Sequence, residues 1–132
     1  MGIETYRNAD FLALPVPAGT KSGAPLRIGG ATGLNVVATT DRANTSVAPR
    51  NADGSVNGTY NYGGGNVDGQ ASCVLVGAHP FVVDFAVANV LDPIYITGAN
   101  ALSADATGNT LYGHALTTKA APSGPLTVRI AN

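Results

Sequence analysis

Residues 81–88 read Phe81-Val82-Val83-Asp84-Phe85-Ala86-Val87-Ala88. Large apolar side chains fill every second position from Phe81 to Val87, and this period of two is typical of a half-buried β-strand. Shorter apolar runs, separated by Gly, Pro or Asn, lie on both sides at residues 26–28, 34–40, 73–76, 93–97, 111–118 and 126–130. No window of eleven residues repeats with the helical period of 3.6. The chain is therefore predicted to be all-β, a small β-barrel or β-sandwich of short strands.

The length and composition fit one domain that spans residues 1–132. A chain of 132 residues has the usual size of a single domain, about 100–150 residues. Hydrophobic residues make up 45% of the chain, so a core is available and disorder is not expected. The only cysteine, Cys73, lies in an apolar run and is expected to be a buried, unreactive thiol. The residues expected to share one β core are Ile94, Ile96, Leu116, Val128 and Ile130.

Residues 1–22 are predicted to form an extended N-terminal arm. Residues 1–10 are polar and show no periodicity. Pro15 and Pro17 exclude a helix and a central strand, because proline has no N–H to donate. Such an arm can lie along a neighbouring molecule or add to the edge of a sheet. The candidate contact residues of the arm are Tyr6, Arg7, Phe11 and Lys21.

Residues 44–70 are rich in Asn and Gly and are predicted to form a flexible or hairpin-bearing excursion. Asp53-Gly54 and Asn57-Gly58 fit two-residue hairpin turns, in which both central residues have positive φ. The glycine run at 63–65 indicates a mobile backbone. The excursion either projects outward as a free tip or orders against a neighbouring subunit. We favour the second role, because Tyr60 and Tyr62 offer contact area at a low entropic cost.

Two segments of eight residues resemble each other weakly. In residues 23–30 and again in residues 91–98, a proline begins a strand of three residues that leads to a glycine. Two related half-barrels would produce this echo, and two unrelated edge strands would produce it equally well. The sequence leaves both interpretations open.

The charge content argues against several classes of partner. Charged residues make up 11% of the chain and the formal net charge is −1, whereas soluble domains contain about 25% charged residues. Much of the surface is therefore expected to lie against other copies of the chain or a partner. Nucleic acid is not an expected partner, because the chain has no basic stripe. A membrane is not expected either, because the chain has no polybasic segment, secretion signal or long apolar run.

The sequence offers no constellation for catalysis or for binding a metal or cofactor. His79 and His114 have no cysteine or carboxylate near them at ligand spacing. The glycine run at 29–33 lacks the Lys-Ser/Thr ending of a phosphate-binding loop. The acidic residues are scattered, so a small hydrolase with paired carboxylates remains only an alternative. We expect no catalytic residue, no metal, no cofactor and no enzymatic activity.

Three segments of the chain resemble, in the same order, three segments of one known protein family. The first is Phe11-x-Ala13-Leu14-Pro15-Val16-Pro17-Ala18-Gly19-Thr20-Lys21-Ser22-Gly23-x-Pro25-Leu26-Arg27-Ile28-Gly29-Gly30, which resembles the opening of the family. The second is Leu91-Asp92-Pro93-Ile94-Tyr95-Ile96-Thr97, similar to the family segment Gly-Asp-Pro-Val-Tyr-Ile-Thr but with Leu91 in place of its Gly. The third is Gly108-Asn109-Thr110-Leu111-Tyr112-Gly113-His114-Ala115-Leu116, similar to Gly-Asn-x-x-Phe-Gly-Tyr-Ala-Leu. Residues 126–130 resemble the closing strand of the same family, which is that of the small capsid cement or decoration proteins in the heads of tailed bacteriophages.

The resemblance implies a structural virion protein without catalytic residues. Such a protein is made in the host cytoplasm and sits on the outer surface of the capsid as a homotrimer, near threefold or quasi-threefold positions. There it binds the major capsid protein and reinforces the contacts between capsomers. Three modest contacts that act together raise the apparent affinity by roughly 10²–10⁴. The alternative function is a surface β-domain that recognises a glycan or a host protein through residues 44–70.

Overall fold

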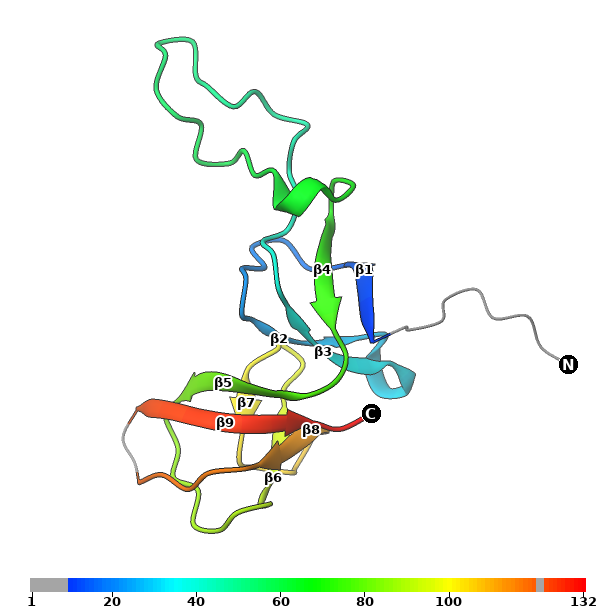
Figure 1. Cartoon of the computed structure of the whole chain (residues 1–132), viewed down its shortest axis with the longest axis vertical. Helices are drawn as coiled ribbons and strands as arrows, with labels where there is room; N and C mark the ends of the chain where they lie inside the picture. The colour runs from blue at the N-terminus through cyan, green and yellow to red at the C-terminus, as the bar shows by residue number, and fades with distance from the viewer. Residues whose placement is uncertain (1–9, 121–122) are drawn as a thin grey trace, which may run out of the picture.

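The computed structural model describes residues 10–120 and 123–132, which form two antiparallel β-sheets (Figure 1). The first sheet has the strand order β1-β4-β3-β2, with β1 (Phe11–Pro15), β2 (Pro25–Ile28), β3 (Leu34–Ala38) and β4 (Gln70–Val74). The second has the order β5-β9-β8-β6-β7, with β5 (Ala78–Val83), β6 (Pro93–Ile96), β7 (Leu102–Ser103), β8 (Thr110–Ala115) and β9 (Gly124–Ile130). Two single 3₁₀ turns, η1 (Gly30–Thr32) and η2 (Gly63–Gly65), complete the described elements. The all-β prediction is confirmed.

The period of two in residues 81–87 is visible in the burial of the side chains. Phe81 and Val83 on β5 are buried, whereas Val82 between them is 76% exposed. β5 pairs with β9 along its full length, so these inward residues meet the inward residues of the C-terminal strand. The two segments of the weak internal echo start strands in different sheets: Pro25 begins β2 and Pro93 begins β6.

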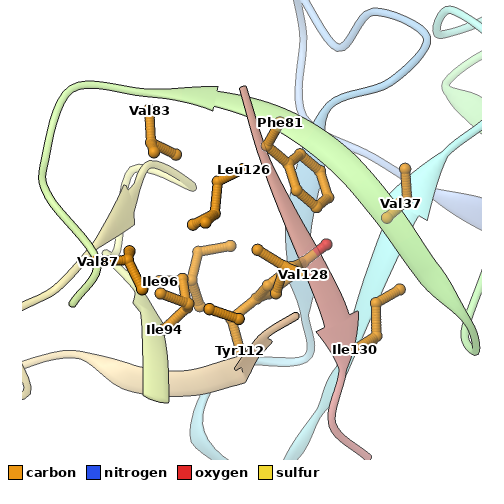
Figure 2. Packing of buried hydrophobic residues seen from close by; sticks show 11 residues of the cluster. Val37, Phe81, Val83, Val87, Ile94, Ile96, Tyr112, Leu126, Val128 and Ile130 are labelled. Atoms are coloured by element: carbon orange, nitrogen blue, oxygen red, sulfur yellow. The ribbon is translucent and has the colours of Figure 1, made fainter. Parts of the chain in front are cut away.

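Each sheet has its own apolar core, and β3 contributes to both. Val36 packs in the core of the first sheet, whereas its neighbour Val37 packs in the core of the second. Figure 2 shows Val37 beside Phe81 and Ile130. Because successive side chains of a strand point to opposite sides, a strand buried on both faces carries a continuous apolar run. The β-branched run of β3 therefore joins the two sheets into one structure.

The prediction of a buried core residue is wrong at one of the five positions. Ile94, Ile96, Val128 and Ile130 are buried within the second core, but Leu116 is 36% exposed. β8 ends at Ala115, which faces inward opposite Val128, so the next residue points outward. The sequence of this run is apolar at both positions and therefore does not reveal which of them faces the core.

A bulge in β8 places the one buried tyrosine of the second core. Ile94 pairs with Gly113 and Tyr95 pairs with Leu111, so Tyr112 is the extra residue between them. Its hydroxyl donates a hydrogen bond to the backbone oxygen of Val36 on β3, at 2.7 Å. Burial raises the pKa of Tyr112, so the hydroxyl stays protonated and remains a donor. The bulge thus produces a polar link between the two sheets.

The described part of the predicted arm belongs to the first sheet. Residues 11–15 form β1, which pairs with β4 at the edge of that sheet. Val16 is buried in the first core, and the Thr20 hydroxyl donates to the Pro17 oxygen at 2.7 Å. From Phe11 onward the chain is therefore integrated into the domain's own sheet and does not form a free arm. The edge position of β1 is consistent with Pro15 at its end, because a strand that contains proline is tolerated at the edge of a sheet.

Residues 44–70 leave the first sheet after β3, project away from both sheets and return at β4 (Figure 1). The backbones of Asn44 and Asn61 bond to each other in both directions, at 2.8 and 3.0 Å. Near the tip, the Asn51 N–H donates to the Ser55 oxygen at 2.8 Å. The expected two-residue turns do not form. Among the residues of the Asp-Gly and Asn-Gly pairs only Gly54 has a positive φ, 88°, which fits a longer hairpin turn.

The glycine run at 63–65 is packed, which corrects the expectation of a mobile backbone. Gly63 is buried, and a Cβ at this position would lie 2.4 Å from the Cα of Ala43. Gly63, Gly64 and Gly65 all have positive φ, at 60°, 69° and 85°. These glycines are needed for a tight turn against the start of the excursion, and not for freedom of movement.

We expect Val128→Ala to lower the free energy of unfolding by about 1–3 kcal/mol, from lost burial and the cavity that remains. Val128 is fully buried on β9, an inner strand that pairs with both β5 and β8. Chemical denaturation monitored by circular dichroism measures the change. Val82→Ala is the matched control, because Val82 is 76% exposed on the neighbouring strand. Equal losses in the two variants would contradict the inward and outward assignment of these strands.

Candidate interaction surfaces

Lys21 lies beside a carboxylate at the end of the first sheet nearest the excursion. Its Nζ is 3.6 Å from Oδ2 of Asp41. Asp41 also accepts hydrogen bonds from the Ser22 N–H at 2.7 Å and from the Asn61 amide at 3.0 Å. These contacts, that of Ser22 foremost, lower the pKa of Asp41, so its contribution to stability is lost only as the pH falls through that lowered pKa. The ionised carboxylate ties the turn at Lys21 to the base of the excursion.

Tyr60 lies next to this turn. Its side chain is half-buried and lines, together with Lys21 and Arg42, a hollow of about 290 Å³. The guanidinium of Arg42 is held in place because its Nε donates to the Val16 oxygen at 3.1 Å. The structure therefore brings together two of the residues predicted from the sequence, Lys21 and Tyr60.

The other predicted contact residues lie elsewhere. Tyr62 precedes η2 and is 65% exposed. Phe11 is 62% exposed on β1, where it pairs with Val74 at the end of β4 that leads into the second sheet. Tyr6 and Arg7 lie outside the described residues. Among the described residues, Phe11 therefore lies apart from the pair Lys21 and Tyr60.

The sequence analysis missed the outward side of the second sheet. This surface, called the outer face below, consists of the outward side chains Ala78, Pro80, Val82, Pro93, Tyr95, Leu111, His114, Leu116, Pro125, Thr127 and Arg129. Val82 lies opposite Pro125, and Tyr95 lies opposite Leu111. Arg129 is the only Lys, Arg, Asp or Glu of the set. One signal in the sequence could have revealed this face: between the inward residues Phe81 and Val83, the outward position is also apolar, namely Val82.

The remaining titratable groups do not converge. A hollow of about 580 Å³ lies between β2, β5 and β7, and Asp84 is the one titratable residue among those that line it. His79 contacts the backbone oxygen of Val76 at 2.9 Å, and burial raises the pKa of the Cys73 thiol. Within residues 10–120 and 123–132, no group of three or more His, Cys, Asp or Glu is placed to hold a metal ion. In the same residues no helix has the length and apolar character needed to cross a bilayer.

Comparison of the chain with models of protein families, with curated proteins and with solved structures finds no match.

Proposed function

We propose that the protein is a structural component of a phage head that binds the outer surface of the capsid and reinforces the contacts between capsomers. Its partner is the major capsid protein, and its seat is the outer face of the second sheet. It acts as a homotrimer on threefold or quasi-threefold positions, without an enzymatic step. Three copies that bind together hold a threefold site more tightly than one copy does.

The observation that carries this proposal is the low charge of the outer face. An antiparallel sheet that exposes one side to water usually carries polar side chains on that side. Here the exposed side carries Val82, Leu111 and Leu116, and its prolines limit the movement of the backbone. Apolar exposed surface of this kind marks a contact with another protein. The face extends across β5, β9, β8 and β6, and this breadth suits a protein surface better than a small molecule.

The positions of the family-like segments in the fold fit the proposal. The second and third family-like segments form β6 and β8, and the closing strand forms β9. β6, β8 and β9 are direct neighbours, so segments that are separated in sequence form one continuous part of the second sheet. Leu91 has a φ of 73°, a conformation that suits the glycine of the family segment.

Binding to capsids that lack the protein tests the proposal. We expect Val82→Lys combined with Leu116→Lys to reduce binding by at least about tenfold, because two ammonium groups would have to be desolvated in the contact. The matched control is Val56→Lys, which adds a lysine at an exposed valine of the excursion. Normal binding by the outer-face variant and lost binding by the Val56 variant would reject the outer face. That result would favour the alternative of a surface module that recognises its target through residues 44–70.

We expect Leu91→Gly to stabilise the protein by about 0.5–1 kcal/mol. A left-handed conformation costs a non-glycine residue about 1–2 kcal/mol, and the greater flexibility of unfolded glycine offsets part of the gain. Leu91 is 60% exposed, so little packing is lost. Ala99→Gly is the control, because Ala99 is also exposed and its φ is not positive. Thermal unfolding should show a gain for Leu91→Gly and no gain for Ala99→Gly.

Limited proteolysis tests whether the excursion orders against a neighbouring subunit, as the two tyrosines suggest. Residues 51–56 are all exposed at the tip, whereas the glycine run at 63–65 is packed against Ala43. We expect cleavage within 51–56 to be fast in free protein and slow on assembled heads. Equal cleavage rates in both states would show that the excursion is a free tip and that Tyr60 and Tyr62 are not contact residues.

A further inference from the structure

The two sheets have four edge strands, β1, β2, β5 and β7. Three of these edges are unsuited to pairing with a strand of another molecule. On β2, the groups that point outward belong to Pro25, which has no N–H, and to Arg27, whose N–H donates to Asn100 Oδ1 at 3.0 Å. On β5, the Ile130 N–H donates to the Gly77 oxygen, so the odd-numbered residues of this strand direct their backbone groups toward β9. The even-numbered residues direct theirs outward, and the middle one of these is Pro80, which has no N–H. β7 has only two residues. Prolines and short strands are the usual means of preventing a sheet from pairing with another.

The edge of β1 is the exception. Leu75 N–H donates to the Asp10 oxygen at 2.8 Å, and Val16 N–H donates to the Gly69 oxygen at 3.1 Å. Residues 10 and 16 therefore direct their backbone groups toward β4. Because this direction alternates along a strand, residues 12 and 14 do the same. The N–H and C=O groups of Phe11 and Ala13 then point away from the sheet. No other described strand pairs with this edge.

The outward groups of β1 are complementary to themselves. In an antiparallel pair of two β1 strands centred on Leu12, Phe11 lies opposite Ala13 of the second copy and exchanges both backbone hydrogen bonds with it. The exposed Phe11 ring then lies beside a small side chain that leaves room for it. Pro15, which cannot donate, lies at the end of β1 and outside these bonds. A head-to-tail pairing would need a second open edge, and the other described edges are blocked.

We infer that β1 is a pairing site for a second copy of this chain, which joins two first sheets edge to edge around a twofold axis. The contact is isologous, so it is distinct from any threefold contact on a capsid and does not rest on the proposed function. Four new backbone hydrogen bonds and the two Phe11 rings form it. The pairing would also cover an apolar edge that otherwise favours aggregation.

Amide hydrogen exchange of the wild-type protein at increasing concentration tests this inference. We expect the Phe11 and Ala13 amides to become protected as the protein associates, whereas the Leu12 and Leu14 amides are protected at every concentration. Light scattering over the same range should show a dimer. A monomer at all concentrations, or an oligomer in which the Phe11 and Ala13 amides still exchange freely, would overturn the inference.

Two variants separate pairing from folding. Ala13→Pro removes an outward N–H that β4 does not use, and we expect it to weaken the association by at least about tenfold, since the dimer loses two hydrogen bonds. Val82→Pro makes the same change on the blocked β5 edge and should leave association unchanged. If Ala13→Pro does not fold, oxidised Leu12→Cys replaces it. Paired Leu12 Cα atoms would lie about 4.5 Å apart, within disulfide range, so a covalent dimer is expected and its absence under oxidation contradicts the pairing.

Discussion

Asn35→Ala is expected to lower the free energy of unfolding by about 3 kcal/mol, because three backbone oxygens lose the hydrogen bonds from its buried side-chain amide. Asn35 lies on β3 and is 2% exposed. Its amide nitrogen donates to the backbone oxygens of Ala131 at 2.7 Å, Leu111 at 2.9 Å and Tyr112 at 3.2 Å. The two amide hydrogens of one side chain of the first sheet are thus shared among three carbonyls of β8 and of the chain just after β9.

The oxygen of the Asn35 side-chain amide is also hydrogen-bonded. Its Oδ1 accepts a hydrogen bond from the Arg27 guanidinium at 3.0 Å. The backbone of Asn35 exchanges two further bonds with the Asn132 side chain, whose amide also donates to the Leu75 oxygen. Alanine keeps these backbone bonds and removes only the side-chain donors and acceptor. The expected loss therefore reports on the link between the sheets and not on β3 itself.

Urea denaturation at neutral pH measures this effect, and two further variants define its cause. Asn35→Asp keeps the shape and the acceptor for Arg27 but places a carboxylate against carbonyl oxygens, so we expect it to be at least as destabilising as alanine. Asn109→Ala removes an exposed amide that donates to the Asp105 oxygen and should cost less than about 1 kcal/mol. A tolerated Asn35→Asp variant would show that the donors at residue 35 do not hold the sheets together.

The fold was largely predictable, since it depends on a pattern that the sequence displays. The period of two at 81–87 and the apolar runs around it correspond to real strands, because alternation is imposed by the geometry of a half-buried strand. Leu116 was misplaced, because two adjacent apolar residues at a strand end carry no information about which one faces inward. Asn35 was not singled out, because its importance comes from three carbonyls that are 76 to 96 residues away in sequence.

The candidate surfaces were less predictable, for two physical reasons. The outer face depends on register, which decides that Val82 and Pro125 are neighbours on the exposed side. The open edge of β1 depends on which backbone groups β4 leaves unused, and the side chains of β1 do not encode this choice. Pro25 and Pro80 were visible in the sequence. That they prevent pairing at two sheet edges became clear only from the order of the strands.

Gly113→Ala is expected to lower the free energy of unfolding by about 3 kcal/mol, because the new methyl group has no space. Gly113 lies on β8 at the bulge, in the third family-like segment. A Cβ there would lie 2.1 Å from the backbone oxygen of Arg129 and 2.9 Å from Cγ1 of Val128. The side chain can rotate away, but the oxygen cannot, because β9 is held between β5 and β8.

Thermal and chemical denaturation of four variants separates this explanation from a general intolerance of alanine. Gly98→Ala is the matched control, because no atom lies within 4 Å of its Cβ position and its φ is not positive, so it should change stability by less than about 0.5 kcal/mol. The double variant Gly113→Ala with Val128→Ala removes the side-chain contact but keeps the clash with the Arg129 oxygen. We expect it to be less stable than either single variant. Recovery of stability in the double variant would show that β9 can move and that the glycine is required only by the valine side chain.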